Sequence, residues 1–248
     1  MRRVLKTPVL GQLVVAAVFG LVLEAITQAK IVSPLTIPKP SAALASLWAE
    51  ITDGTLGAAL ATTFYEIFVA FLIASFLGVS LGYVLWRFQT VGRAAESLLA
   101  AVFSTPTVLL FPIVLVLFGR SPAVPITMAV LVGVIPITIN VRAGLSNVKG
   151  TFLKLGRSLN FTDFQVFSKL LLPAAGPMIF SGLKLGLIYT MIGVTAMEFL
   201  VEIGGLGRKI SSSYTTFDSP AMYSYLLMVL VIAIVLVEVV NRAEARIK

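Results

Sequence analysis

Residues 56–86 read LGAALATTFYEIFVAFLIASFLGVSLGYVLW, and this stretch decides the fold class. Glu66 is the only charged residue in it. A helix needs roughly 20 consecutive, mostly apolar residues to cross the hydrocarbon core of a bilayer, and this run exceeds that length. We therefore predict a transmembrane helix at about 57–86.

Five further apolar runs have the same character. The expected spans are about 8–28, 97–118, 123–146, 174–201 and 220–241. Of the 248 residues, 58% are hydrophobic and 12% are charged, against roughly 25% charged residues in a soluble domain. The first run is longer than a signal-peptide core and lacks a small-x-small cleavage site after it, so we expect it to remain as a membrane helix. The sequence predicts an all-α, polytopic membrane protein of about six transmembrane helices, with residues 1–248 in a single domain.

The connection between the first two spans is rich in proline. Pro34, Pro38 and Pro40 prevent a continuous helix over residues 34–40. Ser41 is expected to cap a short amphipathic helix that ends near Glu50 and lies on the membrane surface.

Lysine and arginine residues gather on one side of the predicted spans. If the N-terminus is cytoplasmic, that side carries Arg2, Arg3, Lys6, Arg87, Arg93, Arg142, Lys149, Lys154, Arg157, Lys169, Arg242, Arg246 and Lys248. The other side carries Lys30, Lys39, Arg120, Arg208 and Lys209. Because cytoplasmic loops are enriched in these residues, both termini are predicted to be cytoplasmic. The net charge of +8 then reflects orientation in a bacterial inner membrane, and no nucleic-acid partner is expected.

The sequence lacks the residues that most catalytic chemistry needs. It contains no cysteine and no histidine, and it has no Walker A, G-x-S-x-G or H-E-x-x-H motif. We therefore expect no catalytic residues, no metal site and no cofactor bound by this chain, which is not predicted to be an enzyme. Any energy for transport must come from another subunit or from an ion gradient.

The longest loop on the positive side, about 147–172, has a helical pattern. Phe152, Leu155 and Leu159 follow helical spacing, with Lys154, Arg157 and Ser158 on the other side. Asn160 is a plausible C-cap, Thr162 can cap the next helix, and Pro173 suits the first turn of the fifth span. The pattern predicts two short helices across the cytoplasmic face, and the periodicity alone favours an interfacial helix resting on lipid headgroups.

This loop, which we refer to as the coupling loop, also resembles a loop of a known family. Gly156-Arg157-Ser158-Leu159-Asn160-Phe161-Thr162, followed by Leu170-Leu171-Leu172-Pro173, resembles the EAA loop of binding-protein-dependent ABC transporter permeases. Thr105-Pro106, Pro112, Phe118-Gly119, Glu198 and Gly204-Gly205-Leu206-Gly207 look like features of the nitrate/sulfonate/taurine branch. Lys154 and Leu155 depart from the family's Glu-Ala, and Asn160 stands where the family has glycine.

This resemblance implies the type I ABC importer permease fold and transport by alternating access. It implies a second copy of the chain, two ATPase subunits that carry ATP and Mg, a periplasmic solute-binding protein, and a small anionic or organic solute. The residues that it assigns to ATPase coupling are Leu155, Gly156, Arg157, Ser158, Leu159, Asn160, Thr162 and Phe164.

Polar residues within the spans are candidates for a pathway or a gate. A charge near the bilayer centre costs roughly 2.5–3.5 kcal/mol on insertion scales, so Glu66 and Glu198 need a role, and Lys184 is a possible partner. For Glu198 the sequence favours a structural ion pair or a hydrogen bond at a broken helix end, because the adjacent glycines suggest a turn to stabilise. The candidates are Thr63, Glu66, Ser104, Thr105, Tyr189, Thr190 and Glu198, although serine and threonine often bond to their own helix.

Two alternative functions remain open at this point. The chain could be an ion-coupled secondary transporter that uses Glu66 or Glu198, although such proteins usually have more spans built as repeats. A membrane-embedded enzyme or assembly factor is a third class, and the missing histidine and cysteine count against it. The pairs Gly78/Gly82 and Gly182/Gly186 have the small-xxx-small spacing that lets helices pack closely, within the fold or between subunits.

Overall fold

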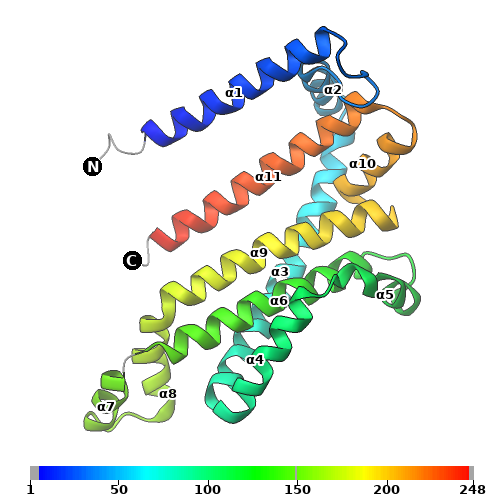
Figure 1. Cartoon of the computed structure of the whole chain (residues 1–248). Coiled ribbons are helices and arrows are strands. Elements are labelled where there is room, and N and C mark those ends of the chain that lie inside the picture. Colours follow the sequence, from blue (N-terminus) through cyan, green and yellow to red (C-terminus); the bar gives the residue numbers. More distant parts are fainter. Residues whose placement is uncertain (1–5, 149, 246–248) are drawn as a thin grey trace.

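The computed structural model describes residues 6–148 and 150–245, without the side chains of residues 6–10, 12, 13, 153, 157 and 245. Arg2, Arg3, Lys149, Arg246 and Lys248, which entered the orientation prediction, lie outside the described residues. Helices make up all the regular secondary structure of the described part (Figure 1), as predicted. They are α1 (Lys6–Gln28), α2 (Pro40–Thr52), α3 (Thr55–Arg87), α4 (Gln89–Ser104), η1 (Thr107–Leu110), α5 (Phe111–Phe118), α6 (Ala123–Ser146), α7 (Gly150–Ser158), α8 (Asp163–Val166), η2 (Phe167–Leu171), α9 (Leu172–Val201), α10 (Gly205–Thr215) and α11 (Ser219–Ala245).

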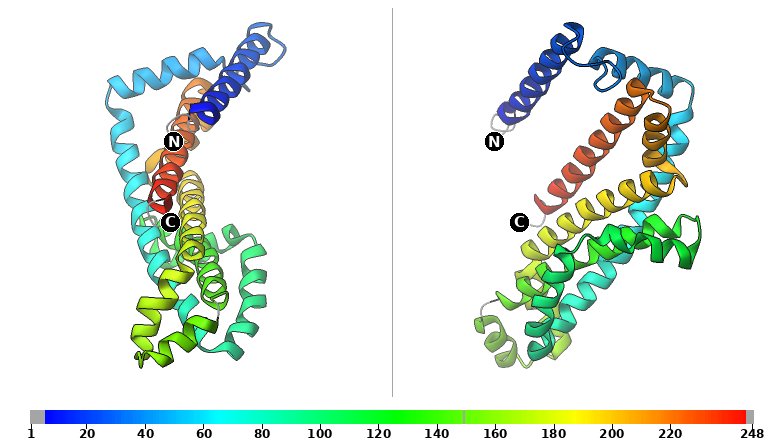
Figure 2. Two further views of the ribbon diagram at one scale, coloured as in Figure 1. Left: turned by 90° about the vertical axis from the view of Figure 1, so that its left-hand side faces the viewer. Right: turned by 45° about the vertical axis from the view of Figure 1, so that its right-hand side comes forward.

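The core is formed by α3, α6 and α9, which lie side by side in both views of Figure 2. Small residues allow this contact. A Cβ atom added at Gly78 would lie 2.7 Å from Ile137 Cβ, and one at Gly186 would lie 2.4 Å from Ile137 Cδ1. Gly82 and Gly182 meet α6 in the same way, at Val141 and Asn140. Both predicted glycine pairs therefore serve packing within the chain.

Four of the described helices are long and apolar enough to cross a membrane by themselves. They are Thr55–Arg87, Ala123–Ser146, Asp163–Val201 and Ser219–Glu244. A fifth crossing is possible if the bent pair Gln89–Ser104 and Thr107–Phe118 counts as one span. The described part of the first predicted span contains a shorter apolar helix, Val14–Gln28. The prediction of about six spans is close to this result.

The third predicted span is broken. We expected one helix over about 97–118, but α4 begins at Gln89 and ends at Ser104, and the next helical segment is bent away from it by 83°. Thr105 precedes Pro106 and takes an extended conformation, with ψ near 135°. The proline ring disfavours helical geometry at the preceding residue, so the helix ends there.

The fifth span begins earlier than predicted. Pro173 lies in the first turn of α9, as expected, but α8, η2 and α9 form one continuous helix over Asp163–Val201. Proline has no N–H to donate to the carbonyl four residues back. The five residues before α9 form a π turn, in which the Leu172 N–H donates to the Phe167 carbonyl. This wider turn lets the helix continue past Pro173.

The connection between α1 and α3 contains the expected surface helix, α2. The prediction that Ser41 caps it is wrong, because the helix begins at Pro40, whose fixed φ suits a first helical position. Instead, the Ser41 N–H and hydroxyl donate to the Glu24 carboxylate, at 3.0 and 2.7 Å. The Glu24 carboxylate of α1 thus accepts hydrogen bonds from the first turn of α2.

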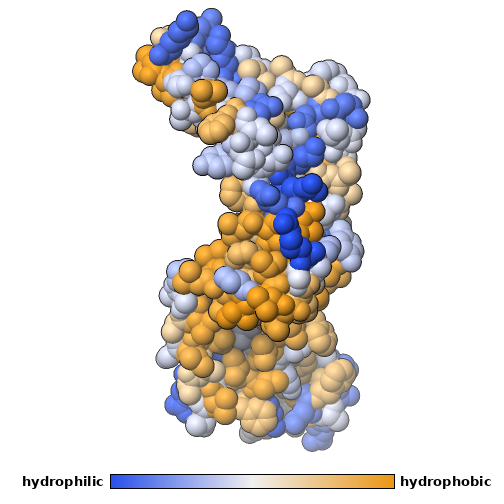
Figure 3. Space-filling model, turned by 90° about the vertical axis from the view of Figure 1, so that its right-hand side faces the viewer, coloured by the Kyte–Doolittle hydropathy of each residue, from blue (hydrophilic) through white to orange (hydrophobic). Residues whose placement is uncertain are grey.

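Four of the short helices lie at two opposite ends of the molecule. Figure 1 places α7 and α8 at one end and α2 and α10 at the other, with α3 running between them. The face drawn in Figure 3 shows a broad hydrophobic area with hydrophilic residues above and below it. Many large apolar side chains are exposed, such as Val116 at 85% and Phe76 at 74%. These features fit helices whose outer surface faces lipid.

Candidate functional site

The coupling loop is held by two adjacent helix caps. Asn160 takes the left-handed conformation, with φ of 50°, and the Phe161 N–H donates to the Gly156 carbonyl at 2.9 Å. This six-to-one bond is typical of a Schellman C-terminus. The Thr162 hydroxyl accepts from the Gln165 N–H at 3.3 Å, and the Gln165 side chain accepts from the Thr162 N–H at 3.0 Å. Both cap predictions are confirmed.

Close packing joins α7 to the helix that follows. Gly156 is buried, and a Cβ atom there would lie 2.8 Å from Val166 Cγ2 and 3.3 Å from Leu170 Cδ1. A larger residue would push α7 away from α8 and η2. The ring of Phe161 also lies beneath the Lys169 ammonium, 5.3 Å from its centroid. The two short helices therefore form one packed unit at the end of α9.

Several apolar side chains of this unit are exposed. The exposed fraction is 45% for Leu155, 52% for Leu159 and 76% for Phe164. The Ser158 hydroxyl donates to carbonyls of its own helix, those of Lys154 and Leu155. The side chain of Arg157 lies outside the described part of the structure. The loop thus presents an apolar surface that its own packing does not use.

A second site lies at the other end of α9, and we refer to it as the Glu198 turn (Glu198, Thr63 and Gly204–Gly207). The Thr63 hydroxyl donates to the Glu198 carboxylate at 2.7 Å and accepts from the Leu206 N–H at 2.9 Å. The Gly207 N–H donates to the same carboxylate at 2.8 Å. Both amides belong to the first turn of α10, where an anion is favoured. The carboxylate therefore ties α10 to α9, and the Thr63 hydroxyl ties both to α3.

Glycine is required where the chain passes over Glu198. Gly205 has φ of 72°, and a Cβ atom there would lie 1.9 Å from Glu198 Oε1. At Gly207 an added Cβ would lie 2.5 Å from Glu198 Cβ. No larger side chain fits at either position. This close approach to Glu198 explains why the sequence after the fifth span is rich in glycine.

Glu66 lies beside this network. It is 1% exposed and packs within hydrogen-bond distance of Glu198, while its Oε2 atom has no hydrogen-bond partner among the described residues. Of the residues predicted for a pathway or gate, the structure brings together Thr63, Glu66 and Glu198. The prediction of Lys184 as their partner is wrong, because its ammonium donates to Asn241 on α11 at 2.5 Å.

The remaining pathway candidates lie elsewhere. Ser104 and Thr105 are exposed and donate to carbonyls of α4, and the buried Thr190 donates to the Leu187 carbonyl. Tyr189 packs its ring edge-on against Phe103, with 5.0 Å between centroids, and lines a groove of about 140 Å³ beside η1. These residues do not form one polar cluster with the Glu198 turn.

Two residues that stabilise these sites were not predicted from the sequence. Gln165 completes the capping box, and the Thr-x-x-Gln spacing from Thr162 was a usable signal for it. Arg120 donates to the carbonyl of Val201 at 2.9 Å, at the end of α9. Nothing in the sequence predicted that contact, since Arg120 lies in the loop after α5 and Val201 ends α9, and the two meet only through the fold.

The fold and the loop define a polytopic helical membrane component with an unused apolar surface at one end. Residues 74–248 match the family model of the binding-protein-dependent transport system inner membrane component. The chain therefore belongs to this family.

Three relatives that match this chain in sequence are named as transport permeases. The formylaminopyrimidine transport permease protein ThiX of Halalkalibacterium halodurans is 28% identical, over 66% of each chain. The nitrate import permease protein NrtB of Leptolyngbya laminosa is 27% identical over 66% of this chain, which spans 59% of NrtB. The taurine transport system permease protein TauC of Escherichia coli is 24% identical, over 84% of this chain and 77% of its own.

Among solved structures, a chain of the inward-facing MetNI methionine ABC transporter matches with a TM-score of 0.69. It is 20% identical, and the match covers 80% of this chain and 99% of that one. This likeness establishes the type I importer permease fold. Nothing in the comparisons favours the alternative of an ion-coupled secondary transporter.

Proposed function

We propose that this chain is the permease subunit of an ATP-driven importer in a bacterial inner membrane. It pairs with a second copy of itself, two ATPase subunits that carry ATP and Mg, and a periplasmic solute-binding protein. Both termini and the coupling loop face the cytoplasm. The relatives are named for formylaminopyrimidine, nitrate and taurine, and a small anionic or organic solute is proposed here.

The observation that carries the proposal is the exposed apolar surface of the coupling loop. Leu155, Leu159 and Phe164 are all more than two fifths exposed, although two caps and the Gly156 contact hold the loop in one shape. A surface that is rigid and apolar suits a docking partner, because little conformational freedom is lost when it is covered. An ATPase groove is that partner in our proposal, with Gly156, Ser158, Asn160 and Thr162 shaping the surface and Arg157 adding a charge.

The mechanism that we propose is alternating access. Nucleotide binding closes the ATPase pair and moves the two coupling loops together, and α9 carries this motion into the membrane. The pathway then opens toward the binding protein, and hydrolysis restores the inward state. In this scheme the Glu198 turn holds α3, α9 and α10 together at the outer end, so that these helices move as one body.

Copurification with the ATPase tests the docking. Co-expressed with the ATPase encoded beside it, the chain should copurify with it, and the double substitution Leu159→Asp and Phe164→Asp should abolish the association. Phe217→Asp is the matched control, because Phe217 is 74% exposed at the opposite end of the molecule. If the double variant still copurified with the ATPase, the loop would not be the docking site.

Cysteine labelling tests the orientation, because the chain contains no cysteine of its own. In intact spheroplasts, a membrane-impermeant maleimide should label Thr216→Cys directly. It should label Ser158→Cys only after the membrane is permeabilised. Labelling of Ser158→Cys from outside would place the coupling loop beyond reach of an ATPase.

A further inference from the structure

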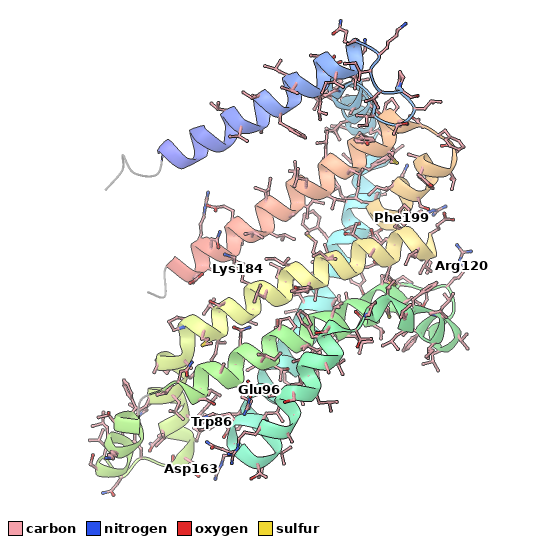
Figure 4. The ribbon with its side chains drawn as sticks, viewed as in Figure 1. Trp86, Glu96, Arg120, Asp163, Lys184 and Phe199 are labelled. Carbon is pink, nitrogen blue, oxygen red and sulfur yellow. The ribbon has the colours of Figure 1, made fainter. Side chains whose placement is uncertain are left out.

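A cleft lies beside the coupling loop, where several helices end. Its two halves, of about 400 and 360 Å³, share Trp86, Gln89 and Leu171 as lining residues. Figure 4 shows Trp86, Glu96 and Asp163 at this end of the molecule. The volumes fall within the usual range for small-molecule sites, roughly 300–1,000 Å³.

The two halves of the cleft differ in charge. The larger half is lined by both Arg87 and Asp163, which balance each other. The smaller half is lined by Arg93 and Arg142, together with Gln89 and Ser146, and no acidic residue among those that the structure describes lines it. We refer to this smaller half as the basic cleft. Its lining offers guanidinium, amide and hydroxyl donors, which suit an oxyanion.

The arginine from α6 is incompletely satisfied. Arg142 pairs through Nη1 with Glu96 of α4, and its side chain is 15% exposed. Its Nε atom is buried without a hydrogen-bond partner among the described residues. This atom packs against Gly92, where an added Cβ would lie 2.9 Å from it, so an occupant of the cleft can reach only the terminal nitrogens of Arg142.

The position of the basic cleft matches the depth of lipid headgroups. The apolar run of α3 ends at Trp86 and Arg87, and α6 ends four residues after Arg142. Tryptophan and tyrosine side chains concentrate at this level of a bilayer, and Tyr83 and Trp86 line the larger half. Basic pockets between transmembrane helices at this level bind anionic headgroups.

We propose that the basic cleft binds a phosphate-type oxyanion, and that the headgroup of an anionic phospholipid supplies it. Val148 and Leu171 of the coupling loop line the same cleft, so an occupant braces the loop against α3 and α4. The proposal concerns binding by this chain alone and is independent of its role in transport.

The test uses the fluorescence of Trp86. Because the chain has two tryptophans, Trp48→Phe leaves Trp86 as the single reporter. The full chain in this background is reconstituted with brominated phosphatidylglycerol or brominated phosphatidylcholine. We expect phosphatidylglycerol to quench Trp86 with a preference of about five-fold for each engaged arginine.

Three substitutions sharpen the test. Arg93→Gln should reduce the preference about five-fold. Arg242→Gln is the matched control, because Arg242 is an exposed cation on α11 outside the cleft. Glu96→Gln removes the carboxylate that competes for Arg142 and should raise the preference, a gain that misfolding would not produce.

A second arm separates the two sources of an oxyanion. In phosphatidylcholine alone, inorganic phosphate is titrated while Trp86 emission is followed. A response to phosphate that is lost in Arg93→Gln, without any lipid preference, supports the site with a soluble occupant. Equal quenching by both lipids with no phosphate response overturns the proposal, as does a preference that Arg93→Gln leaves unchanged.

Discussion

The Glu198 turn and the coupling loop sit at opposite ends of α9 and are built in opposite ways. The Glu198 turn is buried, and its bonds join residues far apart in the sequence, such as Thr63 and Leu206. The coupling loop is mostly exposed, and its caps join residues within a few positions of one another, such as Thr162 and Gln165. The first region fastens helices of this chain to each other, whereas the second fixes its own shape and leaves a surface for another molecule.

The largest effect should come from adding a methyl group inside the Glu198 turn. Gly205→Ala should lower the stability by about 4 kcal/mol or more, because its Cβ would displace the Glu198 carboxylate from its partners. Gly119→Ala is the control, since Gly119 also has a positive φ but open space around it. That change should cost about 1–3 kcal/mol, because φ of 64° with ψ of −167° is a region open essentially to glycine alone. Thermal melting of the solubilised chain measures both, and equal shifts would contradict the packing argument.

A smaller loss should follow from removing the hydroxyl that joins three helices. Thr63→Val keeps the shape but leaves the Leu206 N–H without an acceptor, and should cost about 2–3 kcal/mol. The neighbouring Thr62 donates to its own helix at Ala58, so Thr62→Val should change the stability by less than about 0.5 kcal/mol. The same melting experiment would show comparable shifts if the network carried no stability.

In the coupling loop the effects should be local. Thr162→Ala removes the capping box, which is worth about 1 kcal/mol, so hydrogen exchange of the Gln165 amide should quicken about five-fold. The melting temperature should barely change, because few distant contacts depend on this cap. Thr151→Ala, at an exposed threonine of α7, should leave the Gln165 amide unaffected. A large fall in melting temperature would mean that the loop supports the whole fold.

The smallest effect should be a gain. Asn160→Gly relieves the left-handed conformation of an L-residue and should stabilise the end of α7 by about 0.5 kcal/mol, slowing exchange of the Phe161 amide. Asn147→Gly is the control, since Asn147 has φ of −82° and nothing to relieve. Slower exchange in the control as well would show that glycine acts in some other way.

The predictions from sequence succeeded where the signal was local. Asn160 and Thr162 were recognisable as caps because a left-handed turn and an N-cap each favour few residue types. The apolar runs placed most spans, since length and hydropathy alone define a crossing. The structural role of Glu198 was predicted from the glycines that follow it, and the structure adds the Thr63 hydroxyl and the Gly207 amide that bind its carboxylate.

The failures depended on neighbours in space or on competing local preferences. Lys184 pairs with Asn241, and no spacing along the chain reveals that these two residues meet. At Thr105-Pro106 the signal for a break was present, but the hydropathy of the surrounding run favoured one continuous span. Ser41 looked like a cap, but Lys39 is the N-cap and Pro40 the first helical residue, so Ser41 lies two positions further on, in the first turn.

Asp163–Val201 is one continuous helix of 39 residues, and Figure 1 shows its first segment, α8, at an angle to α9. Phe164 is the second residue of this helix, and Glu198 lies within one turn of its other end. In the mechanism that we propose, a tilt imposed at the Phe164 end would be carried along α9 to the Glu198 end, because α9 packs against α6 between them. The π turn before Pro173 lies between these two ends of the helix, so its stiffness would determine how much of that movement reaches Glu198.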